Sequence, residues 1–371
     1  MFNSRKEKIS IAMVASNLEL NGISSVIMNY IQYINLDKID ITLIVGKKVN
    51  PKYRKLCRER GVKIITLKNK RRNTKKFYFG LLKNFLTHQF DIVHVHGSSA
   101  TIGLELFLAK ISGIKVRIAH SHNTTSPNLK LHKLMKPLLK FSYTEGFACS
   151  KEAGKWLFDD QPFTVIPNGI EVNNFKFNNS VRETTRTKLK LGDSYVVGHI
   201  GRFNYQKNHE FIIKVFEDIL KKRPNSRLLL VGNGPDYDKF KAQLAKKSYI
   251  NKIILYGETN DTSGLYMAMD AFLFPSRFEG LPVTLIEGQI SGLPCLVSDV
   301  ITEDVRLSKN LQFCSLKKSS TYWADKLLNL KPLKRNSFFY NHLKAIDHYY
   351  IKNDVKLLEN KYKEIIKYGK F

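Results

Sequence analysis

The sequence predicts an α/β protein built of two similar domains, each with a parallel β-sheet covered by helices. Three observations support this prediction. The chain has 371 residues, more than a single hydrophobic core usually holds. Short apolar runs, typical of buried strands, alternate with amphipathic segments of helical length. The alternation stops at a polar stretch, residues 173–187, and then begins again.

The first predicted domain, residues 1–172, has strand-like runs separated by helical segments. The expected strands are residues 9–15, 41–45, 62–67, 91–95, 116–120 and 146–149. The expected helices are residues 23–34, 51–60, 74–87 and 99–111, followed by a basic amphipathic segment at 129–141. Because helices separate successive strands, the strands should run parallel, with ligands bound at their carboxyl ends.

The second predicted domain, residues 173–350, repeats this pattern. Its expected strands are residues 195–200, 227–231, 252–256, 271–274 and 295–297. Its expected helices are residues 208–222, 237–247 and 282–291. A final helix, residues 353–368, has apolar side chains at helical spacing, and we expect it to pack back on the first domain.

The composition is that of a globular protein with a large positive charge. Hydrophobic residues make up 43% of the chain and charged residues 25%, which excludes a disordered protein. The formal net charge is +29, which indicates an anionic partner. Nucleic acid, an anionic membrane surface and a phosphorylated substrate are the three classes to consider.

Cysteine usage and the start of the chain indicate a cytoplasmic protein. The four cysteines, at positions 57, 149, 295 and 314, show no CxxC spacing, which favours structural thiols in a reducing compartment. The first ten residues are charged and lead into a strand, unlike a signal peptide. No apolar run reaches the roughly 18 residues that a membrane span needs. We expect a soluble chain, or one attached to a membrane surface.

One stretch, residues 270–299, combines a strand, a loop, a helix and a second strand. Glu279 lies on the loop and Glu287 inside the helix, which Pro282 should start and Gly292 should end. A carboxylate inside such a helix can accept hydrogen bonds from both hydroxyls of a sugar diol. The loop N–H groups, those of Gly280 and its two neighbours Glu279 and Leu281, can reach an anion at the helix start. The alternative is a pair of exposed acids, which the apolar flanks make less favourable.

Two cations follow the first strand of the second domain. Arg202 lies just past the strand and Lys207 opens the next helix, a placement that suits a diphosphate. Solvated surface charges are the alternative interpretation. In the first domain, Gly22 lies in the turn between the first strand and its helix. This turn lacks the GxGxxG pattern, so a plain tight turn and a ligand-binding loop both remain open.

Four histidines follow or end two neighbouring strands of the first domain: His94, His96, His120 and His122. A zinc site is the alternative interpretation, but the two pairs lie on separate strands and no cysteine joins them. An Asp-x-Asp sequence, Asp236 to Asp238, also suggests a metal. It lies at the start of a helix, where acids are favoured by the helix dipole, and we interpret it as a helix-start feature.

The second-domain motifs resemble those of family-4 glycosyltransferases. The resemblance rests on Arg202 and Lys207, on the VGNGP turn at 231–235, and on Glu279 and Glu287 within PSRFEGLPVTLIEGQISGLP. It extends to the Asn21-Gly22 loop and to the PNGI segment at 167–170. The resemblance implies the GT-B fold, in which two Rossmann-like domains face each other across a cleft. It also implies a retaining transfer of a sugar from a nucleotide-diphosphate donor, with no cofactor and no metal bound by the Asp-x-Asp sequence.

The resemblance also implies roles for individual residues. Arg202 and Lys207 would bind the diphosphate and stabilise it as it leaves, while Glu287 would bind the ribose diol. Glu279 would lie near the donor sugar, and the Gly22 loop would approach the diphosphate from the first domain.

On the acceptor side, the resemblance places a histidine of the AHSHN sequence near the reacting sugar. His120 is the first choice and His122 the second, with His96 beside them. No carboxylate is clearly placed as a nucleophile, so the acceptor would attack on the face that the diphosphate leaves.

The positive charge is concentrated in the first domain, which the resemblance makes the acceptor domain. Residues 61–90 contain eight Lys or Arg and no acid, including KNKRR at 68–72, and residues 106–144 contain seven and no acid. The segment at 129–141 has the alternation of an interfacial helix. A glycan or polyprenyl-diphosphate-linked acceptor at the anionic inner face of the plasma membrane would explain this charge. A solvated basic face and a general lysine bias are the alternatives.

We therefore predict a glycosyltransferase of capsule or exopolysaccharide biosynthesis, with a UDP-sugar as the expected donor. A sugar-nucleotide epimerase of the same fold and a non-catalytic partner subunit are the nearest alternatives. A nucleic-acid-binding protein is a third, prompted by the charge. The sequence shows no recognition helix, RNP-type strand or zinc finger, so we expect no nucleic acid as partner.

Overall fold

The computed structural model describes residues 8–19, 21–46, 49–70, 72–126, 128–259, 261–331 and 334–369. The N-terminal segment 1–7, Leu20 of the Gly22 turn and Arg71 of the KNKRR sequence lie outside the described residues. The chain divides into two compact units. Unit 1 is Met1–Gly169 with Ile351–Phe371, and unit 2 is Ile170–Tyr350.

Unit 1 contains a seven-stranded sheet with the order β3-β2-β1-β4-β5-β6-β7, and all of its pairings are parallel. The strands are β1 (Ile9–Ala15), β2 (Ile39–Val45), β3 (Lys63–Thr66), β4 (Ile92–Gly97), β5 (Val116–Ser121), β6 (Glu145–Ala148) and β7 (Thr164–Val165). The strand order reverses between β1 and β4, which is where ligands bind in sheets of this kind. The central strands are buried on both faces. The sequence of β1 is almost continuously apolar for this reason, whereas β4 and β5 also carry buried histidines.

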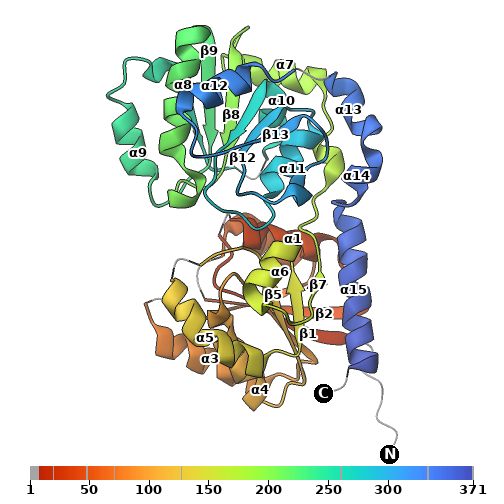
Figure 1. Cartoon of the computed structure of the whole chain (residues 1–371). Coiled ribbons are helices and arrows are strands. Elements are labelled where there is room, and N and C mark those ends of the chain that lie inside the picture. Colours follow the sequence, from red (N-terminus) through yellow and green to blue (C-terminus); the bar gives the residue numbers. More distant parts are fainter. Residues whose placement is uncertain are drawn as a thin grey trace, which may run out of the picture. The chain divides into compact units, whose positions relative to one another are not determined.

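The helices of unit 1 surround this sheet (Figure 1). They are α1 (Gly22–Tyr33), α2 (Pro51–Glu59), α3 (Thr74–Thr87), α4 (Gly103–Ile111), α5 (Leu129–Ser142), α6 (Lys151–Phe158) and α15 (Ile351–Tyr368). Four of them, α1, α2, α5 and α6, begin after an N-cap residue whose side chain accepts a backbone hydrogen bond. Asn21 caps α1 by accepting a hydrogen bond from the N–H of Ser24, and Ser150 caps α6 in the same way from Ala153.

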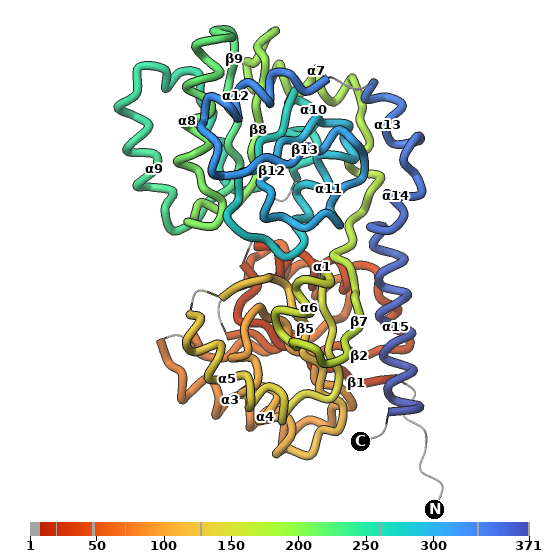
Figure 2. Tube along the Cα trace, viewed as in Figure 1, coloured from red at the N-terminus to blue at the C-terminus, as the bar shows by residue number. Residues whose placement is uncertain are grey.

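The last helix, α15, belongs to unit 1 although it follows the whole of unit 2 in the sequence. Val355, Leu358, Tyr362 and Ile365 form its buried stripe, at the spacing of one helix face. This helix packs against α1, so an early and a late segment of the sequence meet in unit 1 (Figure 2, red and blue). The C-terminal residues therefore contribute side chains to the interior of unit 1.

Unit 2 contains a six-stranded parallel sheet with the order β10-β9-β8-β11-β12-β13. The strands are β8 (Tyr195–Ile200), β9 (Ser226–Val231), β10 (Ile253–Gly257), β11 (Ala271–Phe274), β12 (Cys295–Ser298) and β13 (Leu311–Cys314). The order reverses between β8 and β11. Its helices are α7 (Asn179–Lys188), α8 (His209–Lys222), α9 (Tyr237–Leu244), α10 (Ser263–Ala268), α11 (Val283–Ile290), α12 (Ser320–Leu328), α13 (Arg335–Asn341) and α14 (Leu343–Asp347).

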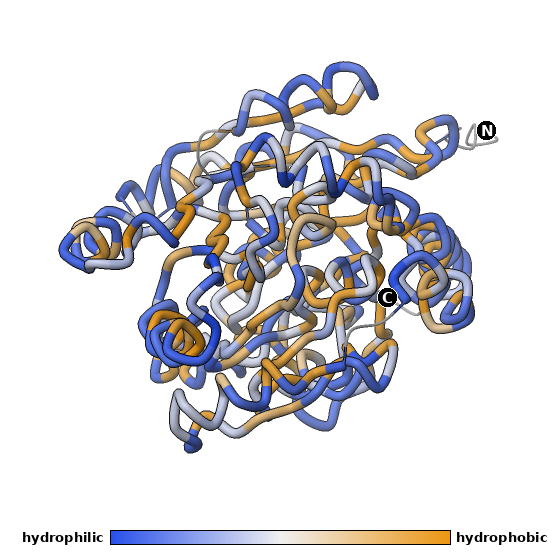
Figure 3. Tube along the Cα trace, turned by 90° about the horizontal axis from the view of Figure 1, so that it is seen from above, coloured by the Kyte–Doolittle hydropathy of each residue, from blue (hydrophilic) through white to orange (hydrophobic). Residues whose placement is uncertain are grey.

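The predicted fold class, two α/β domains with parallel sheets, is confirmed. The peripheral helices carry hydrophobic and hydrophilic residues in alternation (Figure 3), as amphipathic helices over a sheet do. The four cysteines are buried, and none of them forms a disulfide in the part of the chain that the structure describes.

The polar stretch between the two predicted halves contains regular structure. Residues 173–187 include most of a short 3₁₀ turn (Val172–Phe175) and of α7. Arg182 and Arg186 of α7 donate to the last carbonyls of α10 and to Asp270. This helix therefore owes its stability to tertiary hydrogen bonds and ion pairs, and it lacks the apolar stripe by which helices are predicted from sequence.

Candidate functional site

The loop after β8 carries the cations of unit 2 and is shaped by close backbone contacts. Gly232 has a φ of +135°, in the region that favours glycine. A side-chain carbon there would lie 2.2 Å from the carbonyl oxygen of Gly201. Only glycine at 232 lets the turn after β9 approach the loop after β8 this closely. The GNGP sequence thus has a steric reason that is independent of any ligand.

Lys207 and Glu279 form a buried ion pair at this loop. Lys207 Nζ donates to Glu279 Oε1 at 2.7 Å, and Gln206 Nε2 donates to Glu279 Oε2 at 3.0 Å. The two charged side chains are 13% and 9% exposed, so solvent screens the pair only weakly. The ammonium also lies 4.4 Å from the centre of the Phe274 ring. Both carboxylate oxygens of Glu279 are therefore engaged by protein groups.

Backbone contacts hold the Glu279 loop to the Lys207 loop. The N–H of Arg277 donates to the carbonyl of Gln206 at 2.8 Å, and Asn208 Nδ2 donates to the carbonyl of Pro275 at 3.1 Å. Asn208 itself adopts the left-handed conformation, with φ of +58°, which asparagine tolerates better than most residues. The ion pair is thus a consequence of two loops fixed to each other at the carboxyl ends of β8 and β11.

The helix after this loop presents an uncapped N-terminus. Helix α11 begins at Val283, with Pro282 as its N-cap residue, and no side chain accepts a hydrogen bond there. Gly280 and Leu281 are buried next to it. The first backbone N–H groups of a helix have no partner inside the helix, and they carry partial positive charge. This end of α11 can therefore receive an anion.

Glu287 lies one turn into α11 and is held by a tyrosine that the sequence did not suggest. Tyr266 Oη donates to Glu287 Oε2 at 2.8 Å, and it also lies 3.0 Å from the carbonyl of Thr284. Burial raises the pKa of Glu287 to about 7, and the hydrogen bond from Tyr266 opposes this rise. The second carboxylate oxygen remains to accept a hydrogen bond from a ligand hydroxyl.

The two predicted cations have different surroundings. Lys207 is partly buried and paired, whereas the side chain of Arg202 is exposed. The Asp-x-Asp sequence lies at the start of α9, with Asp236 as N-cap residue and Asp238 in the first turn. Its placement agrees with the helix-start interpretation.

In unit 1, the predicted Gly22 is the first residue of α1 and is exposed. No atom lies within 4 Å of the place where a side-chain carbon would be. The backbone at this helix start is therefore open to a ligand.

The four histidines of unit 1 form a ladder of buried, stacked rings across β4 and β5, where His96 is in register with His120. His94 and His96 stack with ring centres 4.1 Å apart, and His120 and His122 with centres 4.2 Å apart. Two hydrogen bonds join the strands. His94 Nε2 lies 3.1 Å from His120 Nδ1, and His96 Nδ1 lies 3.0 Å from His122 Nε2.

Burial keeps these histidines neutral. It lowers the pKa of His94 to about 3 and that of His122 to about 4, and it holds the pKa values of His96 and His120 well below the usual range. For His96 and His120 the neighbouring imidazoles add to this effect. Neutral imidazoles can donate one hydrogen bond and accept one, so each ring has a defined direction.

The same ladder is the place where a metal ion can be considered. His94, His96 and His120 each offer a ring nitrogen, and these nitrogens lie within 4.8 Å of one another. Both nitrogens of His94 are already hydrogen-bonded, to Tyr362 and to His120. The rings are also stacked nearly parallel, whereas the lone pairs of metal ligands converge on one point. The present arrangement fits a hydrogen-bonded ladder better than a metal centre.

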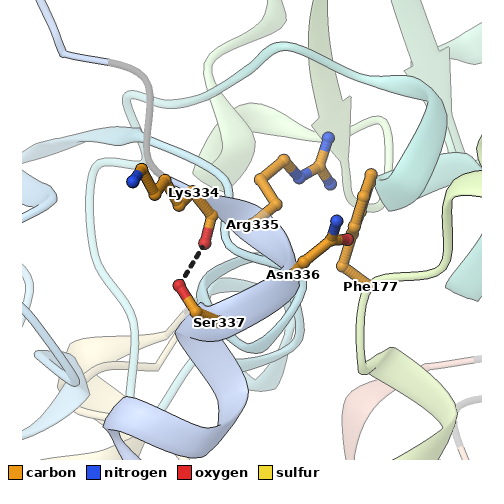
Figure 4. Close-up of a pocket in the computed structure, with 5 residues that line it drawn as sticks. All are labelled: Phe177, Lys334, Arg335, Asn336 and Ser337. Carbon is orange, nitrogen blue, oxygen red and sulfur yellow. Dashed lines mark hydrogen bonds between the residues drawn. The ribbon is translucent and has the colours of Figure 1, made fainter.

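The side chains around a surface hollow in unit 2 have a structural role (Figure 4). It is lined by Phe177, Lys334, Arg335, Asn336 and Ser337. The Arg335 guanidinium donates to the carbonyls of Ser291, Met267, Met269 and Tyr266, and it stacks on the Phe177 ring at 4.2 Å. Each of its three nitrogens donates to a carbonyl at a helix end, so four of its five N–H donors are engaged by the protein.

Three site residues were missed from the sequence: Gln206, Tyr266 and Tyr362. Gln206 adjoins a predicted cation, and this is the only signal that pointed to it. Tyr266 and Tyr362 lie 21 and 268 positions from their partners Glu287 and His94, so no local pattern connects them.

Each half of the chain matches a model of a glycosyltransferase domain. Residues 20–174 match the model described as Glycosyltransferase Family 4, and residues 181–314 match the model described as Glycosyl transferases group 1.

The chain is also similar to named glycosyltransferases of two bacteria. It is 32% identical over 249 residues to the glycosyltransferase EpsF of Bacillus subtilis, covering 64% of this chain and 65% of that protein. It is 27% identical over 328 residues to the UDP-Gal:alpha-D-GlcNAc-diphosphoundecaprenol alpha-1,3-galactosyltransferase of Escherichia coli, covering 80% of this chain and 81% of that protein. The chain thus spans just under two thirds of EpsF and about four fifths of the galactosyltransferase.

Among solved structures, HepE of Anabaena in complex with UDP and glucose has a TM-score of 0.80 at 14% identity. The match covers 96% of this chain and 99% of HepE. At this identity the likeness shows a common fold, with two Rossmann-like domains.

Proposed function

We propose that the chain is a glycosyltransferase of the GT-B fold, because both of its halves match models of glycosyltransferase domains. In this proposal it transfers a sugar, with retention, from a UDP-sugar donor to a lipid-linked glycan acceptor in surface polysaccharide biosynthesis. The observation that supports this proposal most directly is the Lys207–Glu279 pair at the start of α11. This pair joins the loop that carries Arg202 and Lys207 to the segment that carries Glu279 and Glu287, so both segments belong to one site.

Unit 2 is the proposed donor domain. The ammonium of Lys207 has three N–H donors, of which Glu279 takes one, so it can also donate to a diphosphate. Arg202, exposed on the same loop, is the second proposed ligand of the diphosphate. The N–H groups at Gly280 and Leu281, beside the open end of α11, would receive the phosphate oxygens.

Glu287 is the proposed ligand of the ribose. A carboxylate accepts hydrogen bonds from two adjacent hydroxyls, and Tyr266 holds this carboxylate in place. Glu279 is proposed to lie beside the donor sugar, oriented by Lys207 and Gln206.

Retention is supported by the surroundings of Glu279. Both of its oxygens accept hydrogen bonds from protein side chains, so this carboxylate is a poor nucleophile. We propose that the acceptor hydroxyl attacks the anomeric carbon on the face from which the diphosphate departs. The bond between that carbon and the diphosphate oxygen breaks, and the acceptor's proton passes to the departing diphosphate. Lys207 and Arg202 would stabilise the charge that develops on it, without a metal ion.

Unit 1 is the proposed acceptor domain. His120 is proposed to lie at the reacting sugar, with His122 and His96 beside it, and the exposed start of α1 at Gly22 would approach the diphosphate. The names of two similar proteins support the choice of substrates. The Escherichia coli relative is named for a UDP-galactose donor and a diphosphoundecaprenol-linked acceptor, and HepE was solved with UDP.

One face of unit 1 supports a membrane-bound acceptor. Helix α4 packs against both α3 and α5, and the three helices form what we call the α3–α5 face (Figure 1). Large apolar side chains are exposed on it: Phe79, Leu86, Ile111, Leu129, Leu131, Leu134 and Phe141. Phe79 and Leu134 are 72% and 74% exposed. Exposed lysines lie among them: Lys75, Lys76, Lys83, Lys130, Lys133 and Lys140.

Apolar and basic side chains on one surface suit the boundary of an anionic bilayer. In the part of the chain that the structure describes, no helix has the length and hydrophobicity needed to cross a membrane. We propose attachment of this face to the inner surface of the plasma membrane. A soluble sugar-nucleotide epimerase would have no use for such a face.

The proposal is tested by donor binding and by product stereochemistry. We expect UDP-sugars, in preference to GDP- and ADP-sugars, to raise the thermal unfolding temperature, because a ligand at a hundredfold excess over its Kd stabilises the folded state by about 2.7 kcal/mol. With a lipid-linked acceptor, we expect a new glycosidic bond with the donor's anomeric configuration, measured by NMR of the product. A product of inverted configuration would contradict retention, and consumption of donor without acceptor would indicate an epimerase.

A further inference from the structure

We propose that Tyr362 is a positioning residue, which holds His120 in the tautomer with its proton on Nε2. The tautomer is a property of unit 1 alone. Its use in catalysis rests on the proposed function, in which His120 contacts the reacting sugar.

The geometry is a chain of three buried groups from three separate parts of the sequence. Tyr362 Oη, on α15, lies 2.7 Å from His94 Nδ1 on β4. The other nitrogen of that ring, Nε2, lies 3.1 Å from His120 Nδ1 on β5. Phe147 packs edge-on against both imidazoles, at 5.7 and 6.0 Å between ring centres. These contacts fix the planes of the two rings.

The protons in this chain can be placed one after another. The Tyr362 hydroxyl is buried, and among the described residues His94 Nδ1 is the acceptor that it reaches. A buried hydroxyl donates its proton where it can, so Tyr362 donates and His94 Nδ1 accepts. A neutral His94 then carries its own proton on Nε2 and donates it to His120 Nδ1. A neutral His120 must in turn carry its proton on Nε2.

Burial supports the assumption that both rings are neutral. It lowers the pKa of His94 to about 3 and holds that of His120 well below its usual value. The tautomer of a neutral imidazole in such a chain is fixed, because the hydrogen bond at one ring nitrogen determines whether the other nitrogen carries the proton.

The consequence concerns what His120 can do for a substrate. Its Nε2 is buried and has no hydrogen-bond partner among the described residues. With a proton there, His120 is a hydrogen-bond donor to an oxygen of the sugar and cannot be the base that accepts the acceptor's proton. This agrees with the proposed transfer of that proton to the departing diphosphate.

The test is the tautomeric state of the ring nitrogens, read from two-bond ¹H–¹⁵N correlation spectra of the full chain labelled with ¹⁵N-histidine. Protonated and unprotonated ring nitrogens differ widely in ¹⁵N chemical shift, and single histidine substitutions assign the signals. We expect His94 and His120 to be protonated on Nε2 in the wild-type protein at neutral pH. A proton on Nδ1 of His120 would overturn the proposal without any variant.

Tyr362→Phe removes the hydroxyl and keeps the ring. We expect a population of His120 with its proton on Nδ1 to appear, and kcat to fall about tenfold while the KM for the donor stays constant. His96 and His122, which are joined to each other and have no bond to Tyr362, should keep their signals. An unchanged His120 signal in this variant would overturn the proposal.

Tyr30→Phe is the matched control. Tyr30 is also buried and stacks on His120, with ring centres 6.5 Å apart, but its hydroxyl is directed to the carbonyl of Pro167 at 3.5 Å. We expect no change in the His120 tautomer. Zinc added to the wild-type protein should leave the spectrum unchanged, and a shift of the His94 and His120 signals would instead indicate a metal site. Since the spectra need no substrate, failure of the proposed transfer activity would leave the tautomer result intact.

Discussion

Lys207 Nζ lies 2.7 Å from Glu279 Oε1, although the two residues are 72 positions apart in the sequence. The sequence suggested Lys207 as a partner of Arg202 and gave Glu279 a separate role beside the sugar. The contact shows that the cation and the carboxylate are one unit. Each therefore affects both the stability of the loop and the binding of an anion.

The ion pair predicts that stability and activity can be separated. Lys207→Met should lower the free energy of unfolding by about 3 kcal/mol, because it leaves a buried carboxylate without its cation. Adding Glu279→Gln to Lys207→Met should recover most of that loss, because a neutral amide needs no cation. Both proteins should remain at least a hundredfold less active than wild type, since neither has the charge that stabilises the leaving diphosphate. Urea unfolding and initial rates measure the two effects; full activity in the double variant would contradict the assignment of Lys207.

Donor binding should depend on pH through Glu287. Burial raises the pKa of this carboxyl to about 7, so it is largely protonated below that pH and cannot accept from both ribose hydroxyls. We expect donor affinity, measured by calorimetry, to rise as the pH increases through about 7. Glu287→Gln should bind weakly and without this dependence.

Tyr266→Phe provides a second check on the same group. Its hydroxyl lowers the pKa of Glu287 against the effect of burial, so its removal should move the midpoint of the affinity curve to higher pH. A midpoint that stays in place would mean that another group controls the pH dependence of binding.

Asp354 predicts a pH dependence of stability in unit 1. Burial raises the pKa of this carboxyl to about 8, and a hydrogen bond from the backbone of Gly169 opposes the rise. The folded state therefore holds a proton that the unfolded chain loses near pH 4, and the stability of unit 1 should fall as the pH rises from about 4 to about 8. Asp354→Asn, which needs no proton, should remove this slope and raise stability at pH 8 by roughly 1–3 kcal/mol.

Glu364→Gln is the control for this prediction, because Glu364 is an exposed acid on the same helix and pairs with Lys361 at the surface. Exposed ion pairs contribute little to the free energy of unfolding, so the unfolding curves of Glu364→Gln should follow those of wild type at each pH. If Asp354→Asn also followed wild type, the carboxyl would be ionised in the folded state.

The α3–α5 face predicts binding to anionic vesicles. Leu134→Ser combined with Phe141→Ser should lower the partition coefficient at least about tenfold, because each side chain loses roughly 1.5–3 kcal/mol of burial in the bilayer boundary. Tyr322→Ser, which alters an exposed aromatic residue of unit 2, is the control and should leave partition unchanged. Vesicle sedimentation measures the partition coefficients of all three proteins. If the wild type bound neutral vesicles as well as anionic ones, the proposed role of the lysines would be excluded.

The fold class, most strand positions and the candidate residues of unit 2 could be predicted from the sequence alone. Buried strands are visible as apolar runs, as in β1 and β11, and Gly232 and Pro282 mark turns between a strand and a helix. These are local properties of the chain, set by burial and backbone sterics, so they can be interpreted without coordinates.

Which side chains meet depends on the folded chain. Residues 173–187 showed only a polar stretch in the sequence, because the carbonyls and the carboxylate that hold Arg182 and Arg186 of α7 come from residues 267–270. The partners of Glu287 and His94, which are Tyr266 and Tyr362, lie on other elements. Such contacts depend on distances in space that sequence spacing does not encode. For the same reason, the raised pKa of Glu287 and the proposed tautomer of His120 follow from burial and neighbours, and both required the folded chain.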